Sequence, residues 1–208
     1  IVVDLTPLSL GTSIEGDIFD IIVKANSQIP LKEERSYTTT IDGQDAIICE
    51  IYQGERLIAS ENILIGEFIL EGIEIANKGD AEILVSFEID ANGILTVTAE
   101  DKKTLVKKNI KINNSCEIPL EVIDEMKEKA NLLFNKDSIS INQAQAKLDT
   151  RDLIEYQDKL KLLNQTIEIK EVLKEINLFL ENSSDTKYTC KTLISKARNI
   201  IKKTKSNL

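Results

Sequence analysis

The chain has 208 residues, of which 42% are hydrophobic and 29% charged, and this composition is typical of one large globular domain or two smaller ones. No apolar run approaches the roughly 20 residues that a membrane-spanning helix needs, so we expect no membrane partner. Residues 1–115 hold 20 acidic against 10 basic side chains, and such an acidic body disfavours nucleic acid, whose phosphates need a basic surface.

The first part of the chain predicts strands. We interpret residues 1–4 (Ile-Val-Val-Asp) as the remnant of a linker in a longer protein. Short β-rich segments follow, separated by Gly, Pro and Asn-Gly, at about 18–24, 34–41, 46–53, 64–73, 81–90, 94–100 and 105–112. Asn92-Gly93 predicts a hairpin between two alternating runs. Several short strands at this spacing predict an antiparallel β-sandwich.

The stretch 37–56 is the one around which this β part is organised. It predicts two strands joined by a tight turn at Asp42-Gly43. The second strand has two faces, with Ile47, Cys49 and Ile51 on one and Ile48, Glu50 and Tyr52 on the other. Because both faces carry apolar side chains, we expect both to be covered. One cover is the domain core, and the other is either core again, as in an ordinary sandwich strand, or a foreign side chain held in a cleft.

After Pro119 the apolar spacing becomes that of a helix, and proline suits a first helical turn. We expect a break at about 135–140, then a second helical stretch, and then two helices at about 166–181 and 187–204. Ser and Asp in the loop 182–185 are natural N-caps. The predicted fold class is therefore α+β in two parts, with an antiparallel β-sandwich at 5–115 and an α-helical part at 116–208.

The chain contains no histidine, which excludes Ser-His-Asp and Cys-His catalysis and histidine-ligated zinc. Cys49, Cys116 and Cys190 are far apart and not at metal-ligand spacing, which favours a reducing compartment over a disulfide scaffold. An enzyme with Cys49 as nucleophile is one alternative, but no activating cation lies beside it in sequence. A coiled-coil adaptor built on 119–204 is another, although the heptads are not sustained. We expect no catalytic residue and no metal site.

Several short motifs gain meaning from their order. They are DLTPLSLG at 4–11, IPLK at 29–32, QGER at 53–56, IGEFILEGI at 65–73, and FEIDANGIL at 87–95 with Asp101-Lys102. In order and spacing this series resembles the peptide-binding domain of seventy-kilodalton heat-shock chaperones of the DnaK type. The helical part is similar in length and period to about residue 163. The resemblance implies a stress-response chaperone that binds extended apolar segments of unfolded proteins between sandwich loops, under a helical lid.

The same resemblance implies a set of peptide-binding positions. They are Thr12, Ile14, Glu15, Tyr37, Thr38, Thr40, Gln44, Ile47, Cys49 and Ile83. Ile47 is the expected floor of a pocket for a Leu- or Ile-like side chain, whose burial contributes about 1.5–3 kcal/mol. In the family two side chains, usually apolar or aromatic, meet in an arch above the peptide. Here the matching residues are Glu15 and Thr40, so we expect a looser arch and a preference for basic residues beside the central apolar one.

The positions that would hold the lid are Arg56, Lys78, Asp137, Arg151 and Asp152. The family has a basic and an acidic residue at its latch, whereas here Lys78 and Arg151 are both cationic, with Asp152 as a neighbouring substitute. Arg56 and Asp137 keep opposite charges. We therefore expect weaker lid closure and faster peptide release, although exposed pairs contribute under about 1 kcal/mol.

The resemblance also implies an upstream domain that binds ATP and Mg²⁺ and hydrolyses the ATP, a J-domain co-chaperone and a nucleotide-exchange factor. No glycine-rich phosphate loop lies in these residues, so we expect no cofactor and no ATPase activity here. Asp42-Gly43-Gln44 resembles the bacterial and mitochondrial branch, which implies bacterial cytoplasm or mitochondrial matrix. A specialised chaperone for an iron–sulfur cluster scaffold protein, the HscA type, is the alternative to a general one. Self-association through the lid, or through a peptide segment held in the cleft, is a further expectation.

Overall fold

The computed structural model describes residues 4–113, 118–163, 167–181 and 187–206. The chain divides into two compact units, residues 1–141 and 142–208. The last strand ends at Asn113 and the first helix begins at Leu120. The boundary between the units nevertheless falls inside that helix, since its residues up to Ile141 group with the strands.

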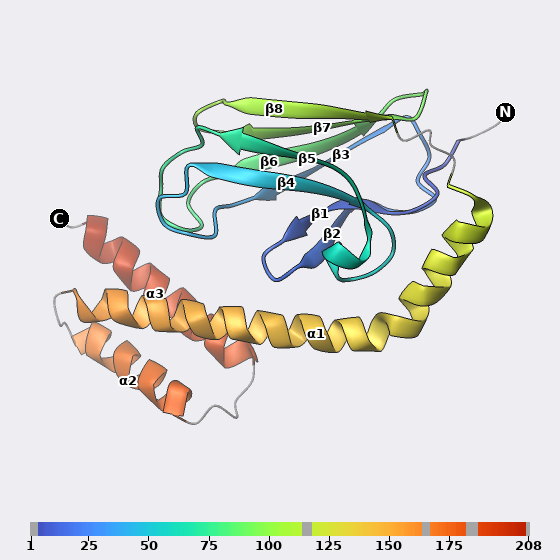
Figure 1. The fold of residues 1–208 in the computed structure, drawn as a ribbon. Helices are drawn as coiled ribbons and strands as arrows, with labels where there is room; N and C mark the ends of the chain where they lie inside the picture. The colour runs from blue at the N-terminus through green and yellow to red at the C-terminus, as the bar shows by residue number, and fades with distance from the viewer. Residues whose placement is uncertain (1–3, 114–117, 164–166, 182–186, 207–208) are drawn as a thin grey trace. The chain divides into compact units, whose positions relative to one another are not determined.

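In the described part of the first unit, eight strands form two four-stranded antiparallel sheets (Figure 1). The first sheet has the order β2-β1-β4-β5, with β2 at Ile18–Val23, β1 at Leu10–Ile14, β4 at Ala46–Gln53 and β5 at Ile63–Glu71. The second has the order β3-β6-β7-β8, with β3 at Leu31–Tyr37, β6 at Ile83–Ile89, β7 at Ile94–Asp101 and β8 at Lys107–Asn113. A short 3₁₀-helix, η1, covers Ala59–Glu61. The predicted sandwich is therefore confirmed.

The core lies between the sheets, because alternate side chains of each strand point inward. Its fully buried members include Leu10, Ile51, Leu70, Ile83, Phe87, Leu95 and Val97. The side of the sandwich between β5 and β8 is closed by apolar contact, in which Ile112 packs close to Gly66: a Cβ added there would lie 2.7 Å from Ile112 Cδ1. The side between β2 and β3 is closed by polar contact, since Asp20 accepts hydrogen bonds from Arg35 and Tyr37.

Three details of the β prediction were wrong. Strand β1 was not predicted, because its sequence LGTSI has a glycine inside it and no run of β-branched residues. The strands on either side of Asp42-Gly43 are not joined by a tight turn alone, since β3 ends at Tyr37, β4 begins at Ala46 and the two belong to different sheets. The outer face of β4 is not covered at Ile48, which is exposed, although Ile47, Cys49 and Ile51 do face the core.

Helix α1 runs without interruption from Leu120 to Lys161, so the predicted break at 135–140 was wrong. Serine weakens a helix mainly by competing for backbone groups, and here Ser140 Oγ donates to the carbonyl of Lys136 (3.1 Å) inside the helix. Helices α2 (Ile167–Glu181) and α3 (Lys187–Ser206) confirm the two predicted later helices. The predicted caps at 182–185 lie outside the described residues.

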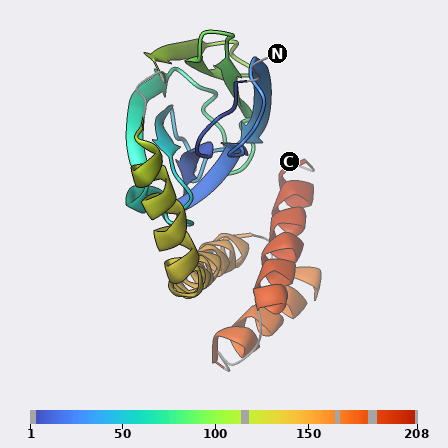
Figure 2. The same cartoon turned by 90° about the vertical axis from the view of Figure 1, so that its right-hand side faces the viewer.

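The second unit has its own core, in which α2 and α3 pack against each other and against the last part of α1 (Figure 2). Its fully buried side chains include Leu153, Leu160, Ile169, Ile176 and Ala197. None of the helices in the described ranges has the length and apolarity that a membrane crossing requires.

Candidate functional site

Four connections of the sandwich lie at one end of it. The register pairs Ile14 with Ile18, Ala46 with Glu71, Tyr37 with Ile83 and Ile83 with Asp101. The loops after β1, β3, β5 and β7 therefore gather at the same end, which we call the loop end. Most of the sequence-derived peptide-binding positions lie at this end, near the strand termini or in these loops, whereas Thr12 and Cys49 lie in the middle of β1 and β4.

The loop between β3 and β4 is held by non-local hydrogen bonds. Gly43, which has a positive φ of 71°, donates its N–H to the carbonyl of Ala76 (2.8 Å). Gly79 N–H donates to the carbonyl of Thr39 (3.1 Å), and Lys78 N–H donates to Asp42 Oδ1 (2.8 Å). These three bonds join this loop to the β5–β6 loop. The two loops therefore form one braced rim.

Gln44 fixes the same loop from within. Its Oε1 accepts the Thr40 N–H (3.1 Å), and its Nε2 donates to the carbonyl of Ala46 (2.8 Å). The amide thus bridges the middle of the loop to the first residue of β4. This role supports the loop rather than a ligand, and the peptide-binding role expected of Gln44 stays a prediction.

Apolar candidates line the core-facing side at the loop end. Cys49 and Ile83 are buried, whereas Ile47 is half-buried and packs against the core from its outer end. Ile14 closes β1 and is exposed. An exposed and a half-buried isoleucine at the open end of a core are available to an incoming apolar side chain.

The polar candidates surround these residues. Thr12 is buried, and its Oγ1 donates to the carbonyl of Glu50 (2.8 Å). Tyr37 is half-buried and donates to Asp20 Oδ2 (2.7 Å); burial and this bond raise the pKa of its hydroxyl. Thr38 is exposed, and the two arch positions, Glu15 and Thr40, are partly exposed.

Sequence reasoning did not find two residues that support these loops. Asp101 is fully buried and accepts hydrogen bonds from the N–H groups of Glu74, Lys103 and Thr104 at 2.6, 2.7 and 3.0 Å. Burial alone would raise the pKa of this carboxyl, but these bonds outweigh it and hold the pKa below its ordinary value. Thr39 is buried, and its hydroxyl has no hydrogen-bond partner among the described residues. Only the location after a strand could have suggested Asp101.

Arg56 and Asp137 come together, as their opposite charges suggested. Arg56 Nε donates to Asp137 Oδ2 (2.7 Å) and Nη2 donates to Oδ1 (2.9 Å), while Nη1 pairs with Glu61 (3.0 Å). Both partners are buried. The bonds from Arg56 lower the pKa of Asp137 against the opposite effect of burial. This bidentate pair fixes the first part of α1 to the connection after β4.

Of the three other lid positions, Arg151 and Asp152 are in the second unit. Arg151 pairs with its neighbour Asp152 (3.1 Å) on α1. Lys78 lies in the first unit, where its backbone braces the loop rim. The latch expected of these residues stays a prediction.

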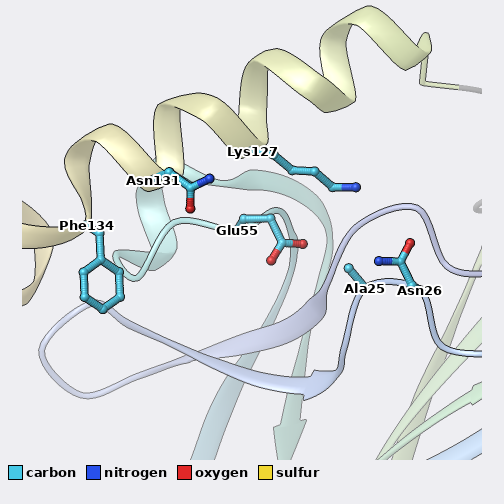
Figure 3. A pocket seen from close by; sticks show the side chains of 7 residues that line it. Ala25, Asn26, Glu55, Lys127, Asn131 and Phe134 are labelled. Carbon is cyan, nitrogen blue, oxygen red and sulfur yellow. The ribbon is translucent and has the colours of Figure 1, made fainter.

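A pocket of about 350 Å³ lies between the first part of α1 and the β2–β3 loop, within the first unit (Figure 3). Its floor is the β2–β3 loop with Glu55, and its wall is the first part of α1. The lining residues are Ala25, Asn26, Glu55, Lys127, Ala130, Asn131 and Phe134. Glu55 is held in place by the N–H of Ser9 (2.8 Å) and its hydroxyl (3.1 Å). No motif or spacing in the sequence predicts this pocket.

Two of the cysteines are described, and both are buried free thiols. Burial raises the pKa of Cys49 to about 11, and burial with the nearby Asp149 and Asp152 raises that of Cys190 to about 11. Such thiols are poor nucleophiles at neutral pH. Cys116, the third cysteine, lies outside the described residues, so the free thiol expected there stays a prediction. Within the described ranges, no cluster of three or more His, Cys, Asp or Glu side chains could hold a metal ion.

Comparison with known proteins defines the family. The family described as "Hsp70 protein" matches residues 1–207. "Heat shock 70-related protein 1, mitochondrial" of Leishmania major is 49% identical over 126 residues, which cover 61% of this chain and 20% of that protein. "Chaperone protein DnaK" of Metamycoplasma hominis is 42% identical over 130 residues (62% and 22%), and that of Thermoplasma acidophilum is 34% identical over 191 residues (85% and 31%).

The chain therefore belongs to the Hsp70 family. It spans between 20% and 31% of the length of these three relatives. The activity and partners of a whole Hsp70 protein are therefore proposals for this chain.

Proposed function

We propose that this chain is the substrate-binding part of an Hsp70 chaperone and that it binds extended apolar segments of unfolded proteins at the loop end of the sandwich. The observation that carries the proposal is that the loop end bears a half-buried Ile47 on β4 and an exposed Ile14 on the neighbouring strand β1, together with a braced loop rim. An extended peptide offers backbone groups at a regular period, so loop backbone can hold many sequences while one apolar site selects a side chain.

The experiment compares two adjacent residues of β4 that face opposite sides. Ile47→Phe fills the proposed site, whereas Ile48→Phe alters the exposed outer face and serves as the matched control. Binding of a fluorescent Leu-centred heptapeptide to the full chain is measured by anisotropy, together with the thermal midpoint. We expect Ile47→Phe to weaken binding about tenfold or more, with the midpoint nearly unchanged and the control unaffected.

Two outcomes would contradict the proposal. If Ile47→Phe unfolds the chain while Ile48→Phe does not, Ile47 is an ordinary core residue. If Ile47→Phe folds and binds the peptide as the wild type does, the loop end is not the binding site.

The charge of the arch sets the preferred flanking residues in this proposal. Glu15 and Thr40 do not close an apolar bridge over the peptide, and the first 115 residues are strongly acidic. We therefore expect Lys-flanked peptides to bind more tightly than Glu-flanked ones at low salt, with the difference shrinking as salt rises. Equal affinity for the two at low salt would contradict this part.

The helical part is proposed as the lid. Closure then depends on the Arg56–Asp137 pair and on whatever contact Lys78, Arg151 and Asp152 make. Because the two latch positions are both cationic, we propose fast peptide release. The release rate should fall when Arg151→Glu restores an opposite charge to Lys78.

The remaining proposals concern the whole protein. An upstream ATP-hydrolysing domain would open and close the cleft, and such coupling is reciprocal, so peptide would bias the nucleotide cycle. A J-domain co-chaperone and a nucleotide-exchange factor would act with that domain, in bacterial cytoplasm or mitochondrial matrix. This chain alone would not hydrolyse ATP.

A general chaperone is the role we favour, because the three relatives above are named as DnaK or heat-shock proteins. The iron–sulfur alternative has no observation in its favour. A competition assay separates the two, since a specialised chaperone would prefer one fixed motif of a scaffold protein over a panel of unrelated apolar peptides.

A further inference from the structure

Two surfaces of the first unit expose apolar side chains to water, and one of them carries negative charges while the other carries positive charges. We propose that they bind each other between two copies of this chain, so that the protein self-associates through its sandwich. The first surface, the acidic strip, consists of Ile48, Glu50, Glu67 and Ile69. The second, the basic tip, consists of Leu105, Val106, Lys107 and Lys108. This proposal does not rest on peptide binding.

The acidic strip lies on the outer face of β4 and β5. The register places Ile48 opposite Ile69, and the two side chains are 65% and 43% exposed. The next pair on this face is Glu50 opposite Glu67. Like charges directly opposite on neighbouring strands destabilise a sheet. A partner that carries an aliphatic group flanked by cations would bury the two isoleucines and reduce the repulsion between the two carboxylates.

The basic tip is the turn between β7 and β8. Five of the ten basic residues in 1–115 fall within 102–111, so this segment is a local cationic patch on an acidic domain. Lys102 and Lys103 pair with Glu100 and Glu74, but Lys107 and Lys108 are exposed at the start of β8. The tip therefore offers cations beside Leu105 and Val106, which is the chemistry that the acidic strip needs.

Leu105 makes the tip unusual. Its side chain is 69% exposed, and its backbone has a φ of +60°, a left-handed conformation that is strained for a bulky residue. The tip is nevertheless rigid, because Asp101 and Leu105 share a backbone hydrogen bond (2.9 Å) and the Asp101 carboxylate holds the Lys103 and Thr104 N–H groups. Strain at an exposed, rigid apolar residue indicates a contact surface.

A second copy is the occupant we infer, for reasons of charge and of geometry. Residues 1–115 hold 20 acidic against 10 basic side chains, so a cationic apolar tip matches the acidic strip better than an average part of this segment would. Within one copy the two surfaces do not cover each other, since both remain exposed. Both halves of the contact exist in every copy, which is sufficient for dimers or longer assemblies.

Sedimentation velocity of the full chain, from micromolar to millimolar concentration, tests the proposal through a charge swap. One variant reverses the strip (Glu50→Lys with Glu67→Lys), and the other reverses the tip (Lys107→Glu with Lys108→Glu). We expect each variant alone to associate about tenfold more weakly or worse, and the equimolar mixture to recover association, because opposite charges then meet again. A monomeric wild type, variants that associate as the wild type does, or a mixture without recovery would overturn the proposal.

The variant Leu105→Gly distinguishes an effect on association from an effect on the stability of the fold. Glycine adopts a φ of +60° without strain, so this variant should keep or raise the thermal midpoint while weakening association several-fold. An excess of Leu-centred peptide is the last control, since it should leave this association unchanged. If the peptide dissolves the assembly, the copies are joined through the cleft, and the proposal is overturned.

Discussion

The sandwich and the helical unit treat a buried carboxylate differently. In the first unit, Asp101 accepts three backbone N–H groups and Asp137 accepts two bonds from Arg56, so the oxygens of both are used. In the second unit, Asp149 is also buried, but only its Oδ1 accepts a side-chain bond, from Gln145 Nε2 (2.7 Å). Asp149 Oδ2 has no partner among the residues that the structure describes.

The buried carboxylates of the first unit therefore hold loops and a helix in place, whereas the buried carboxylate of the second unit does not. A buried charge that is fully paired fixes its neighbours in one arrangement, whereas a half-satisfied one lowers stability without fixing anything. Asp101 holds the loop backbone at the proposed binding end, and Asp137 holds the first part of α1 to the connection after β4. Asp149 holds no such element in the second unit.

The two units can be followed separately through their cysteines. Cys49 belongs to the sandwich core and Cys190 to the helical core, and burial keeps both thiols unreactive in the folded state. In a Cys116→Ser background, labelling of each thiol reports the opening of its own unit.

The largest effect is expected at the ion pair. Asp137→Ala leaves Arg56 buried with only its bond to Glu61, and removing one partner of a buried pair costs about 3–5 kcal/mol. Hydrogen exchange in residues 120–141 should accelerate, while labelling of Cys190 stays unchanged. Asp124→Ala, at an exposed position of the same helix, is the control. Equal exchange in the two variants would show that the pair does not hold the helix.

A smaller loss is expected at Asp101. Asn keeps the shape but replaces one acceptor oxygen by a donor that faces backbone N–H groups, and an unsatisfied buried group costs about 1–3 kcal/mol. Cys49 should label faster in Asp101→Asn than in the control Glu88→Gln, which alters an exposed residue of β6. No difference between them would mean that the loop tip folds without this carboxylate.

Acid should weaken the first unit in a defined direction. The pKa values of Asp101 and Asp137 are lower in the folded state than in the unfolded state. The unfolded chain therefore binds more protons in acid, and stability that is complete above the ordinary aspartate pKa of about 3.9 is lost as the pH falls through the folded values. Urea midpoints of wild type and Asp137→Ala should converge as the pH drops. Parallel curves would contradict this account.

The smallest effect, of opposite sign, is expected at Asp149. Asp149→Asn removes the charge of a buried oxygen that has no partner, so the helical unit should gain up to about 1 kcal/mol or stay unchanged. Slower labelling of Cys190 with unchanged labelling of Cys49 is the expected result. A clear loss of stability would show that the carboxylate has a partner that matters, and the comparison between the units would fail.

Local signals predicted much of the fold. The bounds of β4 and the Asn92-Gly93 hairpin follow from alternation and turn chemistry, and both helices after residue 166 follow from apolar spacing. The turn at Gly43 was also found, but its N–H bonds to Ala76, far along the chain, so the sequence could not show that it joins two sheets. The contact that holds the first part of α1 is likewise non-local, since Arg56 and Asp137 are 81 residues apart.

The candidate site was predicted only as far as the family resemblance reached. Position-by-position transfer named residues of which most lie at the loop end, yet it could not show that Gln44 would bridge its own loop. Exposure of Ile48 was missed, because alternation in a strand says that a face exists but not what lies on it. Asp101 was missed because its partners are backbone groups, which leave no trace in side-chain identity.

The bonds that join the β3–β4 loop to the β5–β6 loop have a consequence for how this protein can change over time. Residues 39, 42 and 43 face residues 79, 78 and 76 in fixed register. Adding or deleting one residue in either segment would misalign all three bonds, so neither loop can alter its length unless the other alters with it. Engineers who want to graft a new specificity should exchange the two segments as a pair.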